Sequence, residues 1–507
     1  MARTASLARG STREHATDIV SQTVNKQRLH MARPPSATLA DLLALLASGQ
    51  AVRASRILRE LGISRPVLRR LVREAGDQVL RVGRARATAY VARASSDAGS
   101  AWPLWRMRPD ATLEELGMLY LLRGERFQFE PAGERPNLNR PVDDVPGHFP
   151  GLPWFLDDLR PQGFLGRSLA HRRGAGLGVP TDLKRWQLRD SLLAITRTGG
   201  TAIGDLLLGS HAVELALAEL DAPPDAVAAA GRRTRYSDWA EAALAGEEIG
   251  SSPGGEQPKF TSTVLTPDGR YAALVKFAVH DTGQAAARWA ELLACEQIAL
   301  ACLRDAGLPA AEAELVDADR HLCLEVRRFD RSQDRIGRQG FVSLLALDAA
   351  FVGAGGHDWS RAGEQLAAEG LIDGQTAGQM AVLHWFGRFI GNSDMHAGNL
   401  GFHLADAGPL TLAPAYDMLP MYLAPSRTGA ARPAVPLALA PPERTGHTAH
   451  IARAAEAAIR FWDQVAGSER IRSAELRQVA RRNQELVARY ARTFAAAGVT
   501  SHTIAKA

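Results

Sequence analysis

The stretch from residue 383 to residue 419, LHWFGRFIGNSDMHAGNLGFHLADAGPLTLAPAYDML, constrains the fold of this chain more than any other part. A helical pattern of apolar residues ends at Gly391-Asn392, and the polar loop that follows carries Asp394, His396 and Asn399. Before the break, apolar residues and one glycine recur at helical spacing on one face: Met380, Leu383, Phe386, Gly387 and Ile390. The sequence therefore predicts a packed helix that holds the start of a polar loop.

Two carboxylates and an amide in this stretch have the spacing of a phosphotransfer site. Asp394 and Asn399 are separated by four residues. A kinase catalytic loop has this spacing, and there the Asp accepts the hydroxyl proton while the Asn binds a metal ion. Asp417 ends the strand-like run LTLAPAYD, where a kinase places a magnesium-binding carboxylate. The first spacing alone is weak, because polar loops are rich in both residues, but the three residues in order indicate phosphotransfer.

Length and composition favour a soluble protein of more than one domain. A chain of 507 residues, 46% apolar and 23% charged, exceeds one core and leaves little room for global disorder. Cys295, Cys302 and Cys323 form no disulfide framework, so we interpret them as buried residues in a reducing compartment. The chain has no apolar run long enough to span a membrane and no secretory signal at its start, which predicts a cytoplasmic protein without membrane contact.

The positive charge is concentrated at the N-terminus. Residues 1–94 hold 17 Lys and Arg against 6 Asp and Glu, whereas the remaining 413 residues hold 43 against 49. This imbalance predicts that an N-terminal module, and not the whole protein, meets a polyanion. Residues 1–37 show no sustained periodicity and are predicted to be a disordered tail.

Residues 38–94 have the pattern of a winged helix-turn-helix. Two short helices, ATLADLLALLASG and VRASRILRELG, each end at a glycine, and ISRPVLRRLVREAG begins with Ser64 as a candidate N-cap. The alternating run at residues 79–94 predicts the two strands of a wing. The last helix would present four arginines to duplex DNA: Arg65, Arg69, Arg70 and Arg73. A helical protein-contact domain with a solvated arginine face is the alternative.

Residues 251–279 predict a glycine-containing loop and a β-hairpin. SSPGGEQPKF precedes the strand-like TSTVLT, a Pro-Asp-Gly turn and YAALVKFA. Such a loop can bring backbone N–H groups to phosphates, and Lys276 on the second strand can then reach them. An ordinary hairpin turn and a solvated lysine are the alternatives. The next predicted helix carries Glu291 and Glu296, either of which could pair with Lys276 or be solvated.

With these residues assembled, the chain resembles the HipA family of serine/threonine kinase toxins from bacterial toxin–antitoxin systems, over roughly residues 102–430. The resemblance is densest in SPGGEQPK, LVKF, VRRFDR, NSDMHAGN and APAYDML. The N-terminal helix-turn-helix makes the layout similar to the YjjJ (HipH) subgroup. The resemblance implies a protein substrate, with aminoacyl-tRNA synthetases as the family's example, and leaves open whether a separate antitoxin is a partner.

The resemblance also implies roles for matching residues. Asp394 matches the catalytic base, Asn399 and Asp417 match Mg²⁺ ligands, and Ser252 matches an inhibitory autophosphorylation site. Glu296, rather than Glu291, matches the helix glutamate. Contacts to ATP are implied at Gly254, Gly255, Glu256, Gln257, Pro258, Lys259, Lys276, Glu296, Arg327, Arg328, Phe329, His396, Ala397, Gly398 and Asn399.

We therefore expect an α+β protein in which a winged helix-turn-helix precedes a two-lobed, HipA-like protein kinase fold with a mostly helical C-terminal lobe. The favoured function is an ATP- and Mg²⁺-dependent serine/threonine protein kinase, a toxin fused to a DNA-binding domain. A DNA-binding regulator with a nucleotide-sensing kinase fold and a small-molecule phosphotransferase remain alternatives. The expected parts are the tail at 1–37, the DNA-binding domain at 38–94, a HipA-like N-terminal subdomain at 102–246, the small lobe at 247–331 and the large lobe at 332–507.

Overall fold

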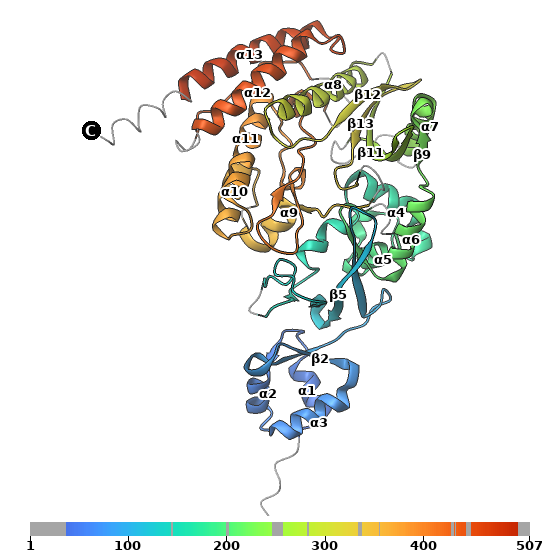
Figure 1. Ribbon diagram of the computed structural model, residues 1–507, viewed down its shortest axis with the longest axis vertical. Coiled ribbons are helices and arrows are strands. Elements are labelled where there is room, and N and C mark those ends of the chain that lie inside the picture. The colour runs from blue at the N-terminus through green and yellow to red at the C-terminus, as the bar shows by residue number, and fades with distance from the viewer. Residues whose placement is uncertain are drawn as a thin grey trace, which may run out of the picture.

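The computed structural model describes most of the chain, and its elements form a mixed α/β arrangement (Figure 1). The expected tail at residues 1–36, the phosphate-loop residues 251–256 and therefore Ser252 lie outside the described residues. No helix of the described chain is long and apolar enough to cross a membrane. The described residues are 37–142, 145–198, 202–245, 257–280, 283–332, 337–353, 355–426, 430, 432–442 and 448–494.

The N-terminal module contains the three helices and the strand pair that the sequence predicted. Thr38 caps the first helix, since its Oγ1 accepts a hydrogen bond from Asp41 N at 3.3 Å while Asp41 Oδ2 accepts one from Thr38 N at 2.7 Å. Strand β3 lies between β1 and β2. The core is formed by Leu42, Leu46, Ile57, Leu68 and Leu71. The elements are α1 (Leu39–Leu45), β1 (Val52–Arg53), α2 (Ala54–Glu60), α3 (Arg65–Ala75), β2 (Val79–Val82) and β3 (Ala89–Ala92).

A five-stranded sheet follows, in the order β7-β6-β5-β4-β8. The strands are β4 (Ala101–Met107), β5 (Leu113–Leu122), β6 (Arg126–Pro131), β7 (His148–Phe149) and β8 (Leu206–Leu208). The accompanying helices are α4 (Gly163–Leu177), α5 (Leu188–Thr198) and α6 (Ser210–Asp221). The sequence missed β8 and the later strand β9, because three-residue strands are too short to show a period.

The N-terminal module packs directly against this sheet (Figure 1). Ala94 N donates to Leu121 O at 2.9 Å, and Leu122 shares a small core with Val82 and Val91. At Gly49 a side chain would meet the carbonyl oxygen of Arg123, so the two chain segments approach as closely as glycine allows. By composition, residues 95–101 (SSDAGSA) are predicted to form a linker. The structure shows a tight turn there, with a bridge between Ser96 and Gly99, and not a free spacer.

The second five-stranded sheet has the order β12-β13-β11-β10-β9 and carries the predicted hairpin. Strands β10 and β11 pair antiparallel, and this pairing sets Lys259 opposite Lys276. Helix α8 (Gln284–Asp305) packs against β11 and is buried along much of its length. The other helix here is α7 (Arg232–Ala245), and the strands are β9 (Ala226–Ala228), β10 (Lys259–Thr266), β11 (Gly269–Val279), β12 (Ala313–Asp317) and β13 (His321–Arg327).

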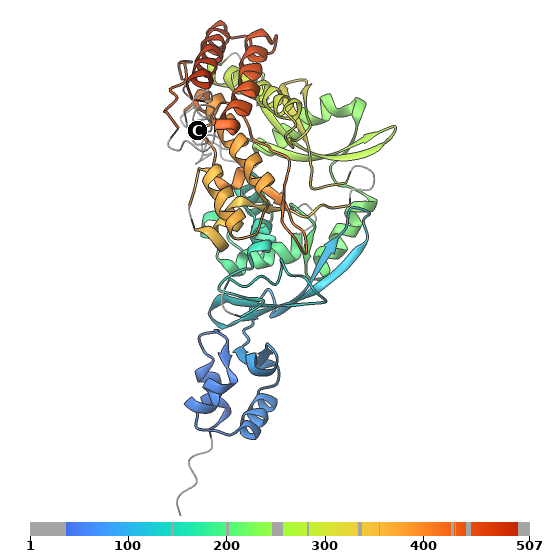
Figure 2. The same ribbon diagram turned by 60° about the vertical axis from the view of Figure 1, so that its left-hand side comes forward.

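The remaining chain is mostly helical, as expected, and its last two helices lie at the end of the molecule opposite the N-terminal module (Figures 1 and 2). Its core includes the fully buried rings of Trp359, Phe386, Phe389, Phe461 and Trp462. Residues 432–442 run along α13, where Leu437 N donates to Asn483 Oδ1 and Tyr490 donates to Ala440 O. The elements are β14 (Val342–Ser343), α9 (Leu344–Leu347), α10 (Trp359–Ala368), α11 (Gly374–Ile390), β15 (Gly401–His403), β16 (Thr411–Leu412), α12 (Thr448–Gly467) and α13 (Ala474–Phe494).

A cluster of ion pairs joins the first sheet to the loop between β15 and β16. Asp406 on that loop pairs with Arg106 at 2.6 Å and with Arg135 at 2.5 Å. Arg106 also pairs with Asp205, and Arg135 with Glu114. Both guanidinium groups are largely buried, so each needs its carboxylate partners to offset desolvation. The loop that carries Asp406 begins a few residues after Asn399, so this cluster supports the end of the polar loop.

We expect Asp406→Asn to lower the melting temperature by several degrees, because two charge-assisted hydrogen bonds worth roughly 1.5–3 kcal/mol each would weaken. The measurement is thermal unfolding of the full chain. Asp268→Asn is the matched control, since Asp268 is exposed at the tip of the β10–β11 hairpin. Equal melting temperatures for the two variants would show that the cluster does not hold the sheet to the loop.

Candidate active site

Helix α11 delivers the polar loop predicted from the sequence. Asp373 begins the helix, where its Oδ1 accepts a hydrogen bond from Thr376 N at 2.7 Å. Gly391 ends it in the left-handed region, with φ of 73°. A Cβ at Gly391 would lie 2.4 Å from the ring of Tyr422, so no larger residue fits. Trp462 donates to Phe389 O at 2.9 Å and ties the last turn of α11 to α12.

Two asparagines fix the backbone of this loop. Asn392 Oδ1 accepts from Asp394 N at 3.0 Å, and its Nδ2 donates to the carbonyl of Asp417 at 3.2 Å. Asn399 Nδ2 donates to the carbonyl of Asp394 at 2.9 Å. The carboxylate of Asp394 is left exposed on a fixed backbone. Sequence reasoning missed Asn392, although it stands two residues before Asp394, because its role depends on a contact with a distant segment.

Lys276 joins three separate segments of the chain. Its Nζ donates to both carboxylate oxygens of Glu296 on α8, at 2.6 and 2.8 Å, and also contacts Asp417 Oδ1. Lys276 is 3% exposed and Glu296 is fully buried. The structure therefore pairs Lys276 with Glu296, as the family resemblance implied. Glu291 instead accepts from Ser473 N at 2.6 Å.

Electrostatics keep Lys276 and Asp417 ionised. Burial alone would lower the pKa of Lys276, but the carboxylates of Asp417 and Glu296 outweigh burial and raise it. Burial would raise the pKa of Asp417, yet Lys276 and then Lys259 lower it to about 2. A stabilising contribution from the depressed Asp417 is present above the usual carboxyl pKa and is lost only as the pH falls towards about 2. The ion pair therefore persists at neutral pH.

Asp417 is held in an uncommon backbone conformation. Its φ of 54° is one of the few positive values at a non-glycine residue among the described positions. Asn392 donates to its carbonyl from one side, while the neighbouring Tyr416 donates to Gly398 O at 2.8 Å. Left-handed backbone at such a residue costs about 1–3 kcal/mol and persists only where the surroundings enforce it. These two hydrogen bonds aim the Asp417 carboxylate at Lys276 and the loop of Asp394.

A cavity of about 250 Å³ brings most of the predicted residues together. Its walls come from the start of α4, from β10 and β11, from α8 and α9, and from the segments around Asp394 and Asp417. Trp289, Leu345, Leu419 and Met421 add apolar surface that the sequence analysis did not assign to the site. The predicted residues that line it are Gln257, Lys259, Lys276, Asp394, His396, Gly398, Asn399 and Asp417.

Three other described residues of the predicted site lie next to this cavity without lining it. Pro258 precedes Lys259, Ala397 is buried in the loop, and Glu296 lies behind Lys276. Glu296 thus positions the lysine and does not face the cavity. Gly254, Gly255, Glu256 and Ser252 lie outside the described residues.

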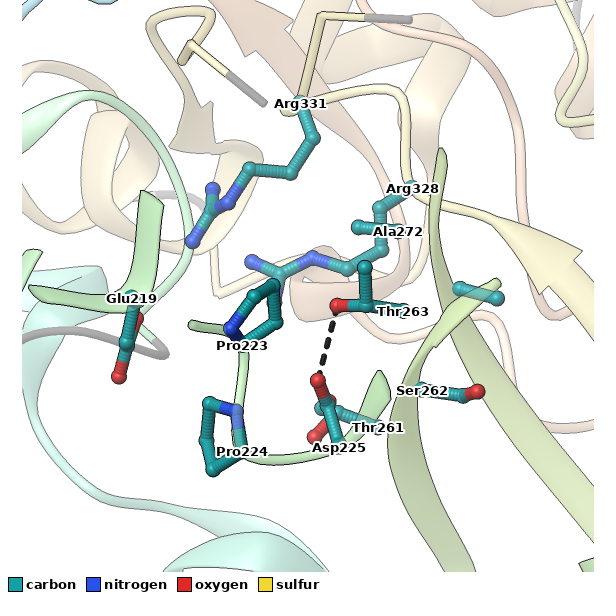
Figure 3. Close-up of a pocket in the computed structure, with 11 residues that line it drawn as sticks. Glu219, Pro223, Pro224, Asp225, Thr261, Ser262, Thr263, Ala272, Arg328 and Arg331 are labelled. Atoms are coloured by element: carbon teal, nitrogen blue, oxygen red, sulfur yellow. Dashed lines mark hydrogen bonds between the residues drawn. The ribbon is translucent and has the colours of Figure 1, made fainter. Parts of the chain in front are cut away.

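Three residues at which the resemblance implied ATP contacts, Arg327, Arg328 and Phe329, do not line this cavity. Arg327 pairs with Glu312 at 2.9 Å and lies over the ring of Tyr271. Phe329 stacks on Tyr416 with ring centres 5.8 Å apart. Arg328 lines a separate hollow of about 90 Å³ with Arg331, Asp225 and Thr263 (Figure 3). None of the three lines the cavity of Lys276, and a contact of these residues with ATP stays a prediction.

Asn399 and Asp417 fit the donor set of a magnesium site. Mg²⁺ is usually bound by one or two protein oxygens together with waters and substrate phosphates. The Nδ2 of Asn399 is engaged by the loop, which leaves its Oδ1 as a ligand, and Asp417 supplies an ionised carboxylate. Within the described chain there is no cluster of three or more His, Cys, Asp or Glu that could hold a metal by itself. The site therefore suits a metal that arrives with phosphates.

Comparisons with solved structures give distant matches. A HipA chain from the complex of Shewanella oneidensis HipA with HipB and operator DNA covers 77% of this chain and 97% of its own length, with 14% identity and a TM-score of 0.45. The Helicobacter pylori proinflammatory kinase CtkA covers 52% of this chain and 96% of its own, with 12% identity and a TM-score of 0.35. Both scores are below 0.5, so neither match bears on the site.

Comparisons of sequence are decisive for the family. Residues 98–217 match the family model of the YjjJ-like toxin middle domain, and residues 251–494 match the HipA-like C-terminal domain. Toxin YjjJ of Escherichia coli strain K12 is 38% identical over 382 residues, which cover 75% of this chain and 83% of that protein. The chain therefore belongs to the family of YjjJ-like toxins with a HipA-like C-terminal domain.

Proposed function

We propose that the chain is an ATP- and Mg²⁺-dependent serine/threonine protein kinase, a toxin whose N-terminal module binds duplex DNA. The observation that carries the kinase proposal is the bridge from Lys276 to Glu296 and Asp417, in a cavity that also exposes Asp394. This is the arrangement that phosphoryl transfer needs, with a lysine for phosphates, a carboxylate for metal and a free base for the hydroxyl. We place this activity in the cytoplasm.

In this mechanism each residue has one task. Lys276, oriented by Glu296, contacts the phosphates of ATP. Asp394 accepts the proton of the substrate hydroxyl, whose oxygen forms a bond to the γ-phosphorus as the bond to the β-phosphate oxygen breaks and ADP leaves. Asn399 and Asp417 would hold Mg²⁺, which when bound neutralises phosphate charge. Asn392 holds Asp394 and Asp417 in fixed relative positions, because its side chain hydrogen-bonds to the backbone of both residues.

The DNA-binding proposal is supported by the surface of α3. Arg65, Arg69, Arg70 and Arg73 are all exposed on this helix, which follows α2 after a short turn. The turn between β2 and β3 carries two more exposed arginines of the module, Arg84 and Arg86. The module lies at one end of the molecule, so a duplex can approach α3 without meeting the catalytic cavity (Figures 1 and 2). The Shewanella complex contains HipB as a separate partner. We expect this chain to contact DNA with its own module and leave a separate antitoxin open.

Asp394→Asn should reduce phosphoryl transfer by about 10²–10⁴-fold, because a general base contributes that much. ATP affinity should change little, since Lys276 and Asp417 stay in place. Transfer of labelled γ-phosphate, alone and with cell extract, measures the first effect and nucleotide titration the second. Ser393→Ala is the matched control on the neighbouring exposed residue. A rate of phosphoryl transfer within a few-fold of that of the parent protein would show that Asp394 is not the general base.

Arg69→Ala/Arg70→Ala in the full chain should weaken binding to duplex DNA at all sequences and reduce the salt slope of log K by about two. Arg481→Ala/Arg482→Ala is the matched control, because it removes an exposed arginine pair from α13 at the other end of the molecule. Binding is measured by fluorescence anisotropy over a salt series. The DNA proposal fails if both variants bind as the parent chain does.

Ser252 should become phosphorylated by the protein itself and this should stop ATP binding. The serine opens SPGGEQPK, and a phosphate there would add nearly two negative charges to the loop that is predicted to bind the phosphates of ATP. Mass spectrometry after incubation with ATP and Mg²⁺ should find phosphate on Ser252 in the parent chain and none in Asp394→Asn. Ser251→Ala resolves the neighbouring serine. Full ATP affinity of Ser252→Asp would contradict the inhibitory role.

A further inference from the structure

A basic surface lies on α4 and the 3₁₀ turn η5 (Leu183–Arg185) that folds back beside it. We call it the α4–η5 face, and it consists of Arg172, Arg173, Lys184 and Arg185. All four side chains are exposed, and within the described chain none of them makes a hydrogen bond or ion pair through its charged group. Residues 95–507 carry 43 Lys and Arg against 49 Asp and Glu, so unpaired positive charge stands out on this body.

The α4–η5 face is held rigidly. Two glycines on α4 allow the returning chain to lie against the helix: a Cβ at Gly174 would be 3.0 Å from Pro180 O, and one at Gly166 would be 3.1 Å from Leu183 Cδ2. Trp186 then donates to Pro180 O at 2.6 Å and closes the return. Asp182 Oδ1 accepts from Lys184 N at 3.0 Å and fixes the turn that carries Lys184 and Arg185. The backbone that carries the four cations is therefore held in place.

Helix α4 connects this face to the catalytic cavity. Gln162 and Gly163 at the start of α4 line the cavity together with Asp394 and Asn399. Arg172 lies nine residues further along, and at 1.5 Å per residue this places it about 14 Å from the cavity wall. Leu165, which is 38% exposed, lies between them on the same helix. One helix therefore carries both the cavity wall and part of the α4–η5 face, close enough for a single bound polypeptide to contact both.

We propose that the α4–η5 face binds an acidic segment of the protein substrate and so selects which hydroxyl is phosphorylated. This inference rests on the proposed kinase function. At about 3.3 Å per residue, an extended chain needs roughly four to six residues to span the distance, so the acidic side chains lie about that far from the acceptor. The four exposed cations complement the charge of carboxylates, so we assign the face to a carboxylate-bearing peptide.

The test uses the full chain and two fluorescein-labelled peptides with one central serine. One peptide carries three consecutive glutamates on each side of the serine, and the nearest glutamate on each side is four residues from it. The other peptide carries glutamines at these positions. We expect the glutamate peptide to bind the parent chain more tightly, as measured by anisotropy without ATP at low salt. Arg172→Ala/Arg173→Ala and Lys184→Ala/Arg185→Ala should each weaken it about fivefold, consistent with up to 1 kcal/mol for each exposed charge pair. Arg481→Ala/Arg482→Ala should not.

The outcomes separate this inference from the kinase proposal. The docking surface is overturned if the parent chain binds both peptides with equal affinity. It is also overturned if Arg481→Ala/Arg482→Ala on α13 lowers the affinity for the glutamate peptide as much as the face variants do. Both results hold whether or not phosphate is transferred. Face-dependent binding of the glutamate peptide without any transfer to serine supports an acidic ligand but overturns its role as substrate. A labelled RNA hairpin that loses affinity in the two face variants, while the glutamate peptide does not bind, also overturns the proposal and assigns the face to RNA.

Discussion

The ion pair of Lys276 with Glu296 and Asp417 is the interaction on which the rest of the catalytic region depends. A lysine that is 3% exposed can stay charged only if carboxylates face it, and a fully buried glutamate needs the same compensation. The three residues come from β11, from α8 and from the segment after β16. Satisfying their charges therefore requires the second sheet, the long helix and the helical part of the chain to pack together. The cavity exists where they meet.

The first sheet contributes to the same site from the other side. Arg106 and Arg135 hold the loop of Asp406, which follows the Asp394 loop along the chain, and α4 begins at the cavity wall. The N-terminal module packs on strand β5 of this sheet. A continuous set of packed elements thus runs from α3 to the cavity. It places the proposed DNA surface and the proposed kinase site in one body, with a short turn between them where composition suggested a free linker.

Much of the local structure could be predicted because its causes are local. The end of α11 at Gly391, the β10–β11 hairpin with its Pro-Asp-Gly turn and the three N-terminal helices all follow from periodicity, caps and turn residues. The short strands β8 and β9 could not be predicted, since three residues carry no period and form only because neighbouring strands offer hydrogen-bond partners. The place of Arg328 could not be predicted for a related reason. It lines a hollow with Asp225, Thr263 and Arg331, which come from segments that only the tertiary structure brings together.

The sequence by itself determined the chemical groups of this protein: a base and an amide separated by four residues, a later carboxylate, a strand lysine and an arginine-rich helix. These groups follow from residue type and from spacing within one element. Only the tertiary structure decided which of them meet, for example Lys276 with Glu296 and not Glu291. Lys276 and Asp417 are 141 residues apart, and Arg106 and Asp406 are 300 apart. Such pairs form because burying the surrounding apolar surface brings the segments together, and no pattern within either segment encodes that meeting.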